Sequence, residues 1–195
     1  MPAPGARSEA QARSLLDEEL DRLAPRREAL GECGAHAVAG WTLEHALEWE
    51  AAALAWQRAS DLDAIDAPAV FHLGLCLLEL GRFADAAAEF RRAAEIDSAS
   101  NRLDWFDEDP AYRLGNALHA QGEFDAALAA YEESAARNVL GVDSLREVAR
   151  LHIVRGEREA ALRALTRMET RAVRLTVRAE VQALRAEAQA LRRRE

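Results

Sequence analysis

Apolar residues recur every three or four positions along most of the chain, which is the spacing of one face of an α-helix. Between residues 70 and 80, for example, they fall on Val70, Leu73 and Leu77. Several such stretches end at a glycine, a residue that readily takes the left-handed conformation that ends helices. These glycines are Gly81, Gly122 and Gly156, and each is followed by a second stretch of the same kind. The pattern predicts an all-α chain built from pairs of helices joined by short turns.

The helix pairs repeat. Segments 70–97 and 111–138 align without a gap at a shift of 41 residues. The shift places Leu73 on Leu114, Gly74 on Gly115, Leu77 on Leu118, Gly81 on Gly122, Phe83 on Phe124, Ala86 on Ala127 and Phe90 on Tyr131. A further shift of 34 residues gives a third copy, 145–172, with Leu165 at the aromatic position. A shift of 34 residues backwards gives a degenerate copy, in which Trp56 matches Phe90 but Leu47 replaces the turn glycine.

This pattern resembles the tetratricopeptide repeat family. The signature of the family is a large residue, Leu-Gly, a large apolar residue, a turn glycine, a small residue, an aromatic residue and another small residue. The two best copies supply it as Val70, Leu73, Gly74, Leu77, Gly81, Ala86, Phe90 and Ala93, and as Ala111, Leu114, Gly115, Leu118, Gly122, Ala127, Tyr131 and Ser134. The resemblance implies a right-handed helix-turn-helix solenoid that works as a non-catalytic protein-interaction scaffold. The implied repeats are 33–66 (degenerate), 67–100, 108–141 and 142–175, within a repeat region of 33–175.

The first helix of each unit lines a concave groove in proteins of this family, which implies a partner-binding surface here. Helical periodicity assigns nine residues to that face. They are Phe71, Leu75 and Leu78 in the first copy, Tyr112, Asn116 and His119 in the second, and Arg146, Arg150 and Ile153 in the third. Asn116 matches an asparagine with which some members bind a C-terminal carboxylate, and Arg146 and Arg150, one turn apart, could chelate an anion. Alternatively, the two arginines pair with Glu147 or with acids of a neighbouring repeat.

The ends of the chain extend beyond the repeats. We expect a flexible tail at 1–7, an N-terminal amphipathic helix within 8–32 that ends near Pro25, and a C-terminal capping helix at 176–195. The C-terminal segment carries a heptad-like stripe of Val177, Val181, Leu184, Ala188 and Leu191. The stripe fits a helix that caps the last repeat, or a short coiled coil that would dimerise a self-assembling structural protein. Asp109 and Asp143 are predicted N-caps, and Pro68 and Pro110 suit first helical turns.

Seven residues beyond the 34-residue period lie between the first two copies, within Ser98 to Asp109. This insertion holds Trp105 and Phe106 among acidic residues. Either the two aromatic side chains fold back over the flanking helices, or the loop contacts a partner, because insertions in solenoids map to loops on one face.

Composition and charge narrow the function further. The 195 residues include 34 acidic and 25 basic residues, every basic residue is arginine, and the net charge is −9. The charge is uneven, with 22 acids and 10 arginines in residues 1–110 against 12 acids and 15 arginines in residues 111–195. An acidic chain binds nucleic acid poorly. A regulatory accessory factor that contacts nucleic acid through the basic end formed by Arg192, Arg193 and Arg194 is therefore only an alternative to a protein-binding scaffold.

Neither a cofactor nor a metal is expected. The five histidines show no His-x-x-x-His spacing and no Cys-His cluster, and a chain without lysine cannot form a phosphate-binding Gly-Lys loop. No apolar run is long enough to span a membrane, and two cysteines are too few for a disulfide framework. The sequence therefore predicts a cytoplasmic, non-enzymatic protein that binds a protein or peptide, with homodimerisation as a possibility.

Overall fold

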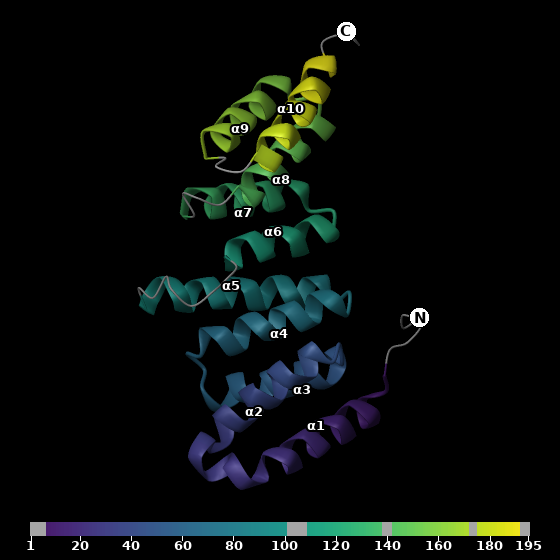
Figure 1. Ribbon diagram of the computed structural model, residues 1–195, viewed down its shortest axis with the longest axis vertical. Coiled ribbons are helices and arrows are strands. Elements are labelled where there is room, and N and C mark those ends of the chain that lie inside the picture. The colour runs from purple at the N-terminus through teal and green to yellow at the C-terminus, as the bar shows by residue number, and fades with distance from the viewer. Residues whose placement is uncertain (1–6, 101–108, 138–141, 172–174, 192–195) are drawn as a thin grey trace. The chain divides into compact units, whose positions relative to one another are not determined.

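The computed structural model describes residues 7–100, 109–137, 142–171 and 175–191, and within these ranges every regular element is a helix (Figure 1). In chain order the elements are α1 (Glu9–Leu23), a 3-10 turn (Ala24–Arg26), α2 (Arg27–His45), α3 (Trp49–Leu62), α4 (Ala67–Glu79), α5 (Phe83–Ser100), α6 (Pro110–Ala120), α7 (Phe124–Arg137), α8 (Asp143–Val154), α9 (Arg158–Arg171) and α10 (Leu175–Ala190). The predicted all-α fold of helix-turn-helix repeats is confirmed. The chain forms two compact units, an N-terminal unit of residues 1–113 and a C-terminal unit of residues 114–195.

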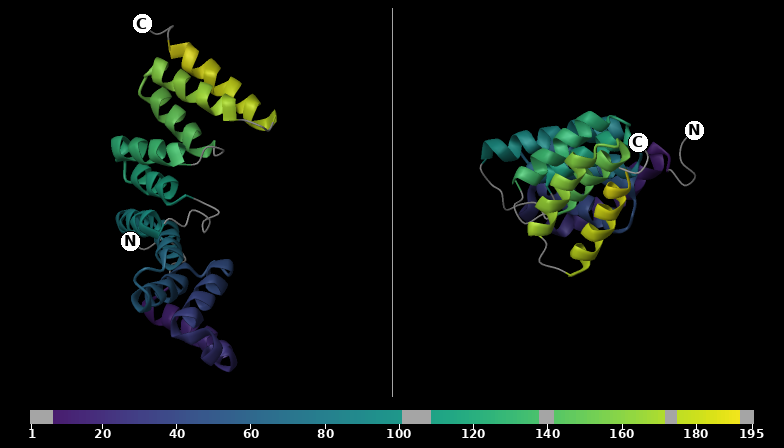
Figure 2. Two further views of the ribbon diagram at one scale, coloured as in Figure 1. Left: turned by 90° about the vertical axis from the view of Figure 1, so that its left-hand side faces the viewer. Right: turned by 90° about the horizontal axis from the view of Figure 1, so that it is seen from above.

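Neighbouring helices in the sequence pack against one another within each unit. In the N-terminal unit, α2 packs on α3, α3 on α4 and α4 on α5, while α1 packs on both α2 and α3. In the C-terminal unit, α7 packs on α8, α8 on α9 and α9 on α10. All three views show α9 and α10 side by side (Figures 1 and 2). Each of these helices therefore packs mainly against helices that lie close to it in the chain, as expected for stacked repeats.

The turns between paired helices follow the predicted glycines. Gly81, Gly122 and Gly156 have φ angles of 72°, 80° and 75°, a left-handed conformation that glycine adopts without steric cost. In the degenerate pair α2–α3, Leu47 occupies the same place with φ of 60°, and it is the only non-glycine residue with positive φ in the described ranges. The repeat frame therefore imposes the turn conformation even where the sequence lacks the glycine that suits it.

Close packing inside each pair explains the other repeated glycine. A Cβ atom added to Gly74 would lie 2.7 Å from the Phe90 ring, and one added to Gly115 would lie 2.4 Å from the Tyr131 ring. The degenerate pair repeats this contact, since a Cβ on Gly40 would lie 2.7 Å from the ring of Trp56. The aromatic residue of the second helix thus fills the space left by the glycine of the first.

The third pair, α8–α9, uses a different combination at the same two positions. Ala149 replaces the glycine and Leu165 replaces the aromatic residue, and both are fully buried. The smaller side chain on α9 is compatible with the methyl group on α8, since a smaller partner leaves more space between closely packed helices.

The starts of two helices test the predicted N-caps, and the outcomes differ. The Asp109 carboxylate accepts a hydrogen bond from the Ala111 amide (2.9 Å) at the start of α6, so its predicted N-cap role is confirmed. The prediction for Asp143 is wrong, because Val142 is the N-cap of α8 and Asp143 is its first helical residue, paired with Arg146. Pro68 lies in the first turn of α4, as predicted.

The N-terminal helix begins as its sequence suggests but is shorter than the predicted segment. Ser8 and Gln11 form a capping box at the start of α1, which ends at Leu23, just before Pro25. Residues 27–32 belong instead to α2, which is kinked at Gly31 (φ 69°). Of the tail predicted at 1–7, only Arg7 lies within the described residues, and it pairs with Glu48.

The apolar stripe of α10 is directed at its own chain. Val181 and Ala188 are fully buried, and α10 packs against α9 and α8. An ion pair between Arg185 and Glu169 (2.9 Å) adds a polar contact between α10 and α9. The stripe therefore serves to cap the C-terminal unit, which is the first of the two uses that its sequence allowed.

Candidate partner-binding surface

One position of the repeat lies one residue after the packing glycine on each first helix. The shifts of 34 and 41 residues place Trp41, Leu75, Asn116 and Arg150 there, on α2, α4, α6 and α8 respectively. Trp41 was not among the residues predicted for the groove, although the match of Gly40 with Gly74 was enough to find it. Its side chain is 56% exposed, an unusual exposure for a tryptophan.

In the N-terminal unit, α2 and α4 carry apolar side chains that are at least partly accessible to solvent. Trp41 and Val38 are exposed, while Leu75 and Leu78 are half-buried. The Trp41 ring contacts the His45 ring one turn further on, with ring centroids 3.8 Å apart. We call Val38, Trp41, Leu75 and Leu78 the Trp41 surface.

Phe71 does not share this accessibility. Only 4% of the residue is exposed, and its ring lies against Phe90 with centroids 5.6 Å apart. Periodicity placed Phe71 on the correct helix but could not give its depth. Its main contribution is to the core between α4 and α5.

A partly buried polar cluster joins α2 to α4. The Glu44 carboxylate accepts hydrogen bonds from His72 Nδ1 (3.0 Å) and from the Cys76 thiol (3.3 Å), and the His72 ring stacks on Trp56 with centroids 4.6 Å apart. His72 and Cys76 lie four residues apart on one helix, a spacing that the sequence analysis did not single out. Helix α2 supplies the carboxylate from 28 residues earlier in the chain.

The chemistry of this cluster is structural. Burial, together with the neighbouring Glu44 carboxylate, raises the pKa of the Cys76 thiol far above its usual range, and the residue is fully buried. A thiol that stays protonated is a poor nucleophile and a poor metal ligand. Among the described residues, no group of three or more His, Cys, Asp or Glu residues is arranged to hold a metal ion.

The second set of predicted groove residues lies on α6. Tyr112 is half-buried, with the Arg113 guanidinium 6.0 Å from its ring centroid. The Asn116 Oδ1 atom accepts a hydrogen bond from the Tyr131 hydroxyl (2.8 Å), which fixes the orientation of the Asn116 amide. His119 is exposed, and its ring lies edge-on to Phe124 at 5.3 Å.

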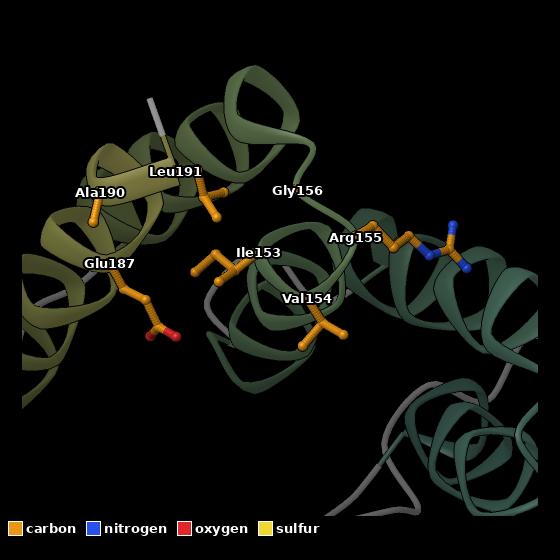
Figure 3. Close-up of a pocket in the computed structure, with 7 residues that line it drawn as sticks. All are labelled: Ile153, Val154, Arg155, Gly156, Glu187, Ala190 and Leu191. Atoms are coloured by element: carbon orange, nitrogen blue, oxygen red, sulfur yellow. The ribbon is translucent and has the colours of Figure 1, made fainter. Parts of the chain in front are cut away.

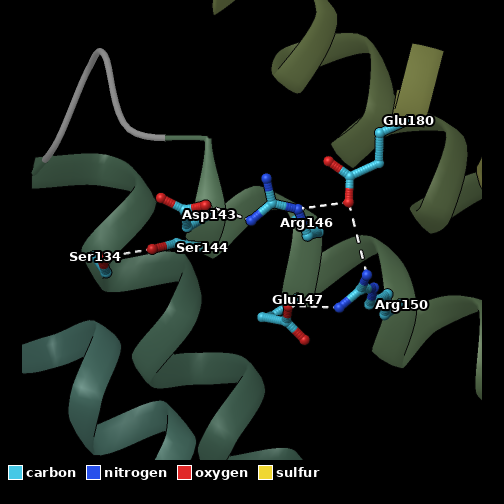
Figure 4. A network of polar contacts seen from close by, with 7 residues as sticks. All are labelled: Ser134, Asp143, Ser144, Arg146, Glu147, Arg150 and Glu180. Carbon is cyan, nitrogen blue, oxygen red and sulfur yellow. Dashed lines mark hydrogen bonds and ion pairs between the residues drawn. The ribbon is translucent and has the colours of Figure 1, made fainter. Parts of the chain in front are cut away.

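Arg146 and Arg150 converge on one carboxylate of their own chain (Figure 4). Glu180 Oε1 on α10 lies 2.7 Å from Arg146 Nε and 3.6 Å from Arg150. Each arginine has a second acidic partner on α8, Asp143 for Arg146 and Glu147 for Arg150. Of the two alternatives for these arginines, the structure shows the one in which acids of the same chain neutralise them.

The remaining predicted residues divide between the core and the undescribed part of the chain. Ile153 is 6% exposed, at the end of α8. Trp105 and Phe106, predicted as a partner loop, lie outside the described residues, as do Arg192, Arg193 and Arg194. Within the described part of the chain, no helix has the length and apolar character needed to cross a membrane.

Stacked helix pairs with glycine turns and a small-against-large contact in each pair define a helical-repeat protein. The particular repeat is the tetratricopeptide repeat, whose sequence profiles match residues 67–100 and 109–138. These two segments are thus tetratricopeptide repeats, and α2–α3 and α8–α9 are further helix pairs of the same kind outside the matched segments. No curated protein sequence matches the chain.

Solved structures show the same fold at low sequence identity. The chain is similar to a structure described as MamA, with a TM-score of 0.68 and 17% identity over 85% of this chain and 94% of that one. It is also similar to PilF of Pseudomonas aeruginosa (0.65, 18%, covering 95% and 90%). A third structure is YrrB, described as a TPR protein with an unusual peptide-binding site (0.62, 15%, covering 96% and 90%). At these identities the likeness concerns the fold.

Proposed function

We propose that the protein is a non-catalytic scaffold that holds a polypeptide partner against the first helices of its repeats, with the Trp41 surface as the main contact in the N-terminal unit. The observation that carries this proposal is the exposed Trp41 at the same repeat position as Leu75. Exposed tryptophan is costly in water and is enriched in the centres of protein interfaces. The structurally similar YrrB is itself described as having a peptide-binding site.

The nature of the surface favours a polypeptide as the partner. It combines a large aromatic ring with aliphatic side chains on two neighbouring helices, which suits apolar side chains spaced along a partner helix or extended segment. The N-terminal unit that carries it is acidic overall, since residues 1–113 hold 22 acids and 11 arginines. A partner with apolar residues flanked by basic ones would complement both properties.

In the C-terminal unit the same face is polar, and its arginines are already paired. Glu180 occupies the place that a partner carboxylate would take between Arg146 and Arg150, so a carboxylate from outside would have to displace an internal one. The apolar Trp41 surface, which has no such internal occupant in the contacts described, supports the proposal better than the arginine pair does.

Partner capture tests the proposal directly. The immobilised chain would be incubated with an extract of its native cells, and the retained polypeptides compared for the wild type and the double variant Trp41→Ser, Leu75→Ser. We expect the variant to lose the specifically retained polypeptide while its circular dichroism shows unchanged helicity. Leu62→Ser is the matched control, since Leu62 is similarly exposed (50%) but ends a second helix, α3. Equal retention by the wild type and the double variant would contradict the proposal.

A further inference from the structure

A hollow of about 470 Å³ lies between the end of α8 and the last turns of α10, within the C-terminal unit (Figure 3). Its apolar lining comes from Ile153, Val154, Ala190 and Leu191. Val154 is 84% exposed, the highest exposure among the large apolar side chains of the described residues. We call this space the α8–α10 hollow. Its volume lies in the range of small-ligand sites. A single side chain would fill only part of it.

The charge of the hollow is negative. The Glu187 carboxylate points into it, and in the described part of the chain no hydrogen bond or ion pair reaches this carboxylate. Arg155 also lines the hollow, but its guanidinium points away and lies 2.7 Å from Asp125. One unpaired carboxylate therefore stands beside an apolar wall, with no cation of the described chain to neutralise it.

The surroundings of Glu187 differ from those of Glu180, an earlier glutamate on the same helix. Two turns before Glu187 on α10, Glu180 is neutralised by Arg146 and Arg150 of α8 (Figure 4). There the two helices satisfy each other's charges. At Glu187 they present a carboxylate and aliphatic side chains with no basic partner from α8.

We propose that the α8–α10 hollow binds a lysine or arginine side chain of a polypeptide partner. The aliphatic stem of such a side chain packs along Ile153, Val154 and Leu191, and its cationic head meets Glu187 while remaining in contact with water. This inference rests on the proposed scaffold function, because it assumes a polypeptide partner. It adds a basic anchor residue to the partner, whose cation would pair with the carboxylate of Glu187.

Small amides of single amino acids test the hollow without knowledge of the partner. The full-length protein would be titrated with N-acetyl-lysine methylamide, and the NMR signals of the methyl groups of Ile153, Val154 and Leu191 followed. N-acetyl-norleucine methylamide has the same stem without the ammonium group, and N-acetyl-glutamate methylamide carries the opposite charge. We expect the lysine compound to bind about 5-fold more tightly than the norleucine compound, which corresponds to a partly exposed ion pair. The glutamate compound should not bind.

Two variants connect the preference to Glu187. In Glu187→Gln the lysine and norleucine compounds should bind equally, whereas Glu123→Gln, which removes an exposed carboxylate between α6 and α7 outside the hollow, should keep the difference. Equal binding of the two compounds to the wild type would overturn the inference, as would a lysine preference that survives Glu187→Gln. Lysine binding that requires removal of residues 192–195 would overturn it too, since the occupant would then be the chain's own arginines.

The titration and the capture experiment fail independently. The hollow lies on α8 and α10, whereas the capture experiment alters only α2 and α4 of the other unit. Partner retention that depends on Trp41 but without a lysine preference in the hollow would remove this inference and leave the proposed function intact.

Discussion

Replacement of Gly115 by alanine should destabilise the protein, although the same replacement usually stabilises a helix. The added Cβ would lie 2.4 Å from Cε1 and 2.5 Å from Cδ1 of the Tyr131 ring, where ordinary contacts begin at 3.4 Å. Tyr131 is 2% exposed and its hydroxyl is bonded to Asn116, so the ring must shift by about 1 Å within a packed interior. Overpacking of this kind costs about 1–3 kcal/mol, against a gain of about 1 kcal/mol in helix propensity. The difference is a net loss of up to about 2 kcal/mol.

Gly34→Ala is the matched control. Gly34 lies inside α2, and a Cβ there would meet only Leu30 Cβ at 3.5 Å, an ordinary contact. This variant should gain up to about 1 kcal/mol from helix propensity alone. Urea unfolding of the full chain, followed by circular dichroism at the helical band, measures both. If Gly115→Ala were as stabilising as Gly34→Ala, the close glycine–aromatic contact proposed as the basis of the repeat would be refuted.

The third repeat supplies a rescue for the destabilised variant. Ala149 and Leu165 occupy in α8–α9 the positions of Gly115 and Tyr131, and they pack with no exposed surface. The double variant Gly115→Ala, Tyr131→Leu should therefore be more stable than the sum of the single losses predicts, by at least about 1 kcal/mol. Additive losses would show that the two positions are not coupled through contact.

Three further predictions use single residues. Leu47→Gly should stabilise the chain by about 0.5–1 kcal/mol, because relief of the left-handed strain exceeds the entropy cost of glycine, and a lowered urea midpoint would contradict this. Burial raises the pKa of the Cys76 thiol more than that of the Cys33 thiol, so iodoacetamide near pH 8 should label Cys33 first and Cys76 only on unfolding. Burial lowers the pKa of His36, so protons favour the unfolded state, and the free energy of unfolding should fall as pH drops below about 6.5. His36→Gln should flatten that dependence between pH 7 and 5, and equal slopes in the two proteins would contradict the assignment.

The fold could be predicted from the sequence because the residue spacing within each repeat is enough to define its two helices and the turn between them. The spacing from Gly74 to Phe90 encodes a helix, a turn and a helix that must pack closely, and the same spacing recurs at Gly115 and Tyr131. The same spacing also holds in the degenerate copy, where Gly40 and Trp56 make the equivalent contact. A local pattern of this kind survives the loss of one of its residues, as Leu47 shows at the turn.

The candidate site was less predictable, because periodicity assigns a residue to a face and does not give its depth or its partners. Phe71 and Leu75 are on the same helix face by period, yet the first is buried and the second is partly accessible. The pairing of Arg146 with Glu180 spans 34 residues and depends on how α10 packs, which the sequence of α8 alone cannot show. Glu44 likewise reaches His72 only through the stacking of α2 against its neighbours.

Photo-cross-linking from single positions tests most directly whether the first-helix face binds the partner. A photoreactive phenylalanine analogue would replace Trp41 or Leu75 on the first helices and, as a control, the exposed Arg91 on the second helix α5. The protein would be irradiated in an extract of its native cells. We predict a discrete polypeptide adduct from positions 41 and 75, competed away by unlabelled wild-type protein, and none from position 91. Adducts of equal yield from all three positions, or from position 91 alone, would contradict the account.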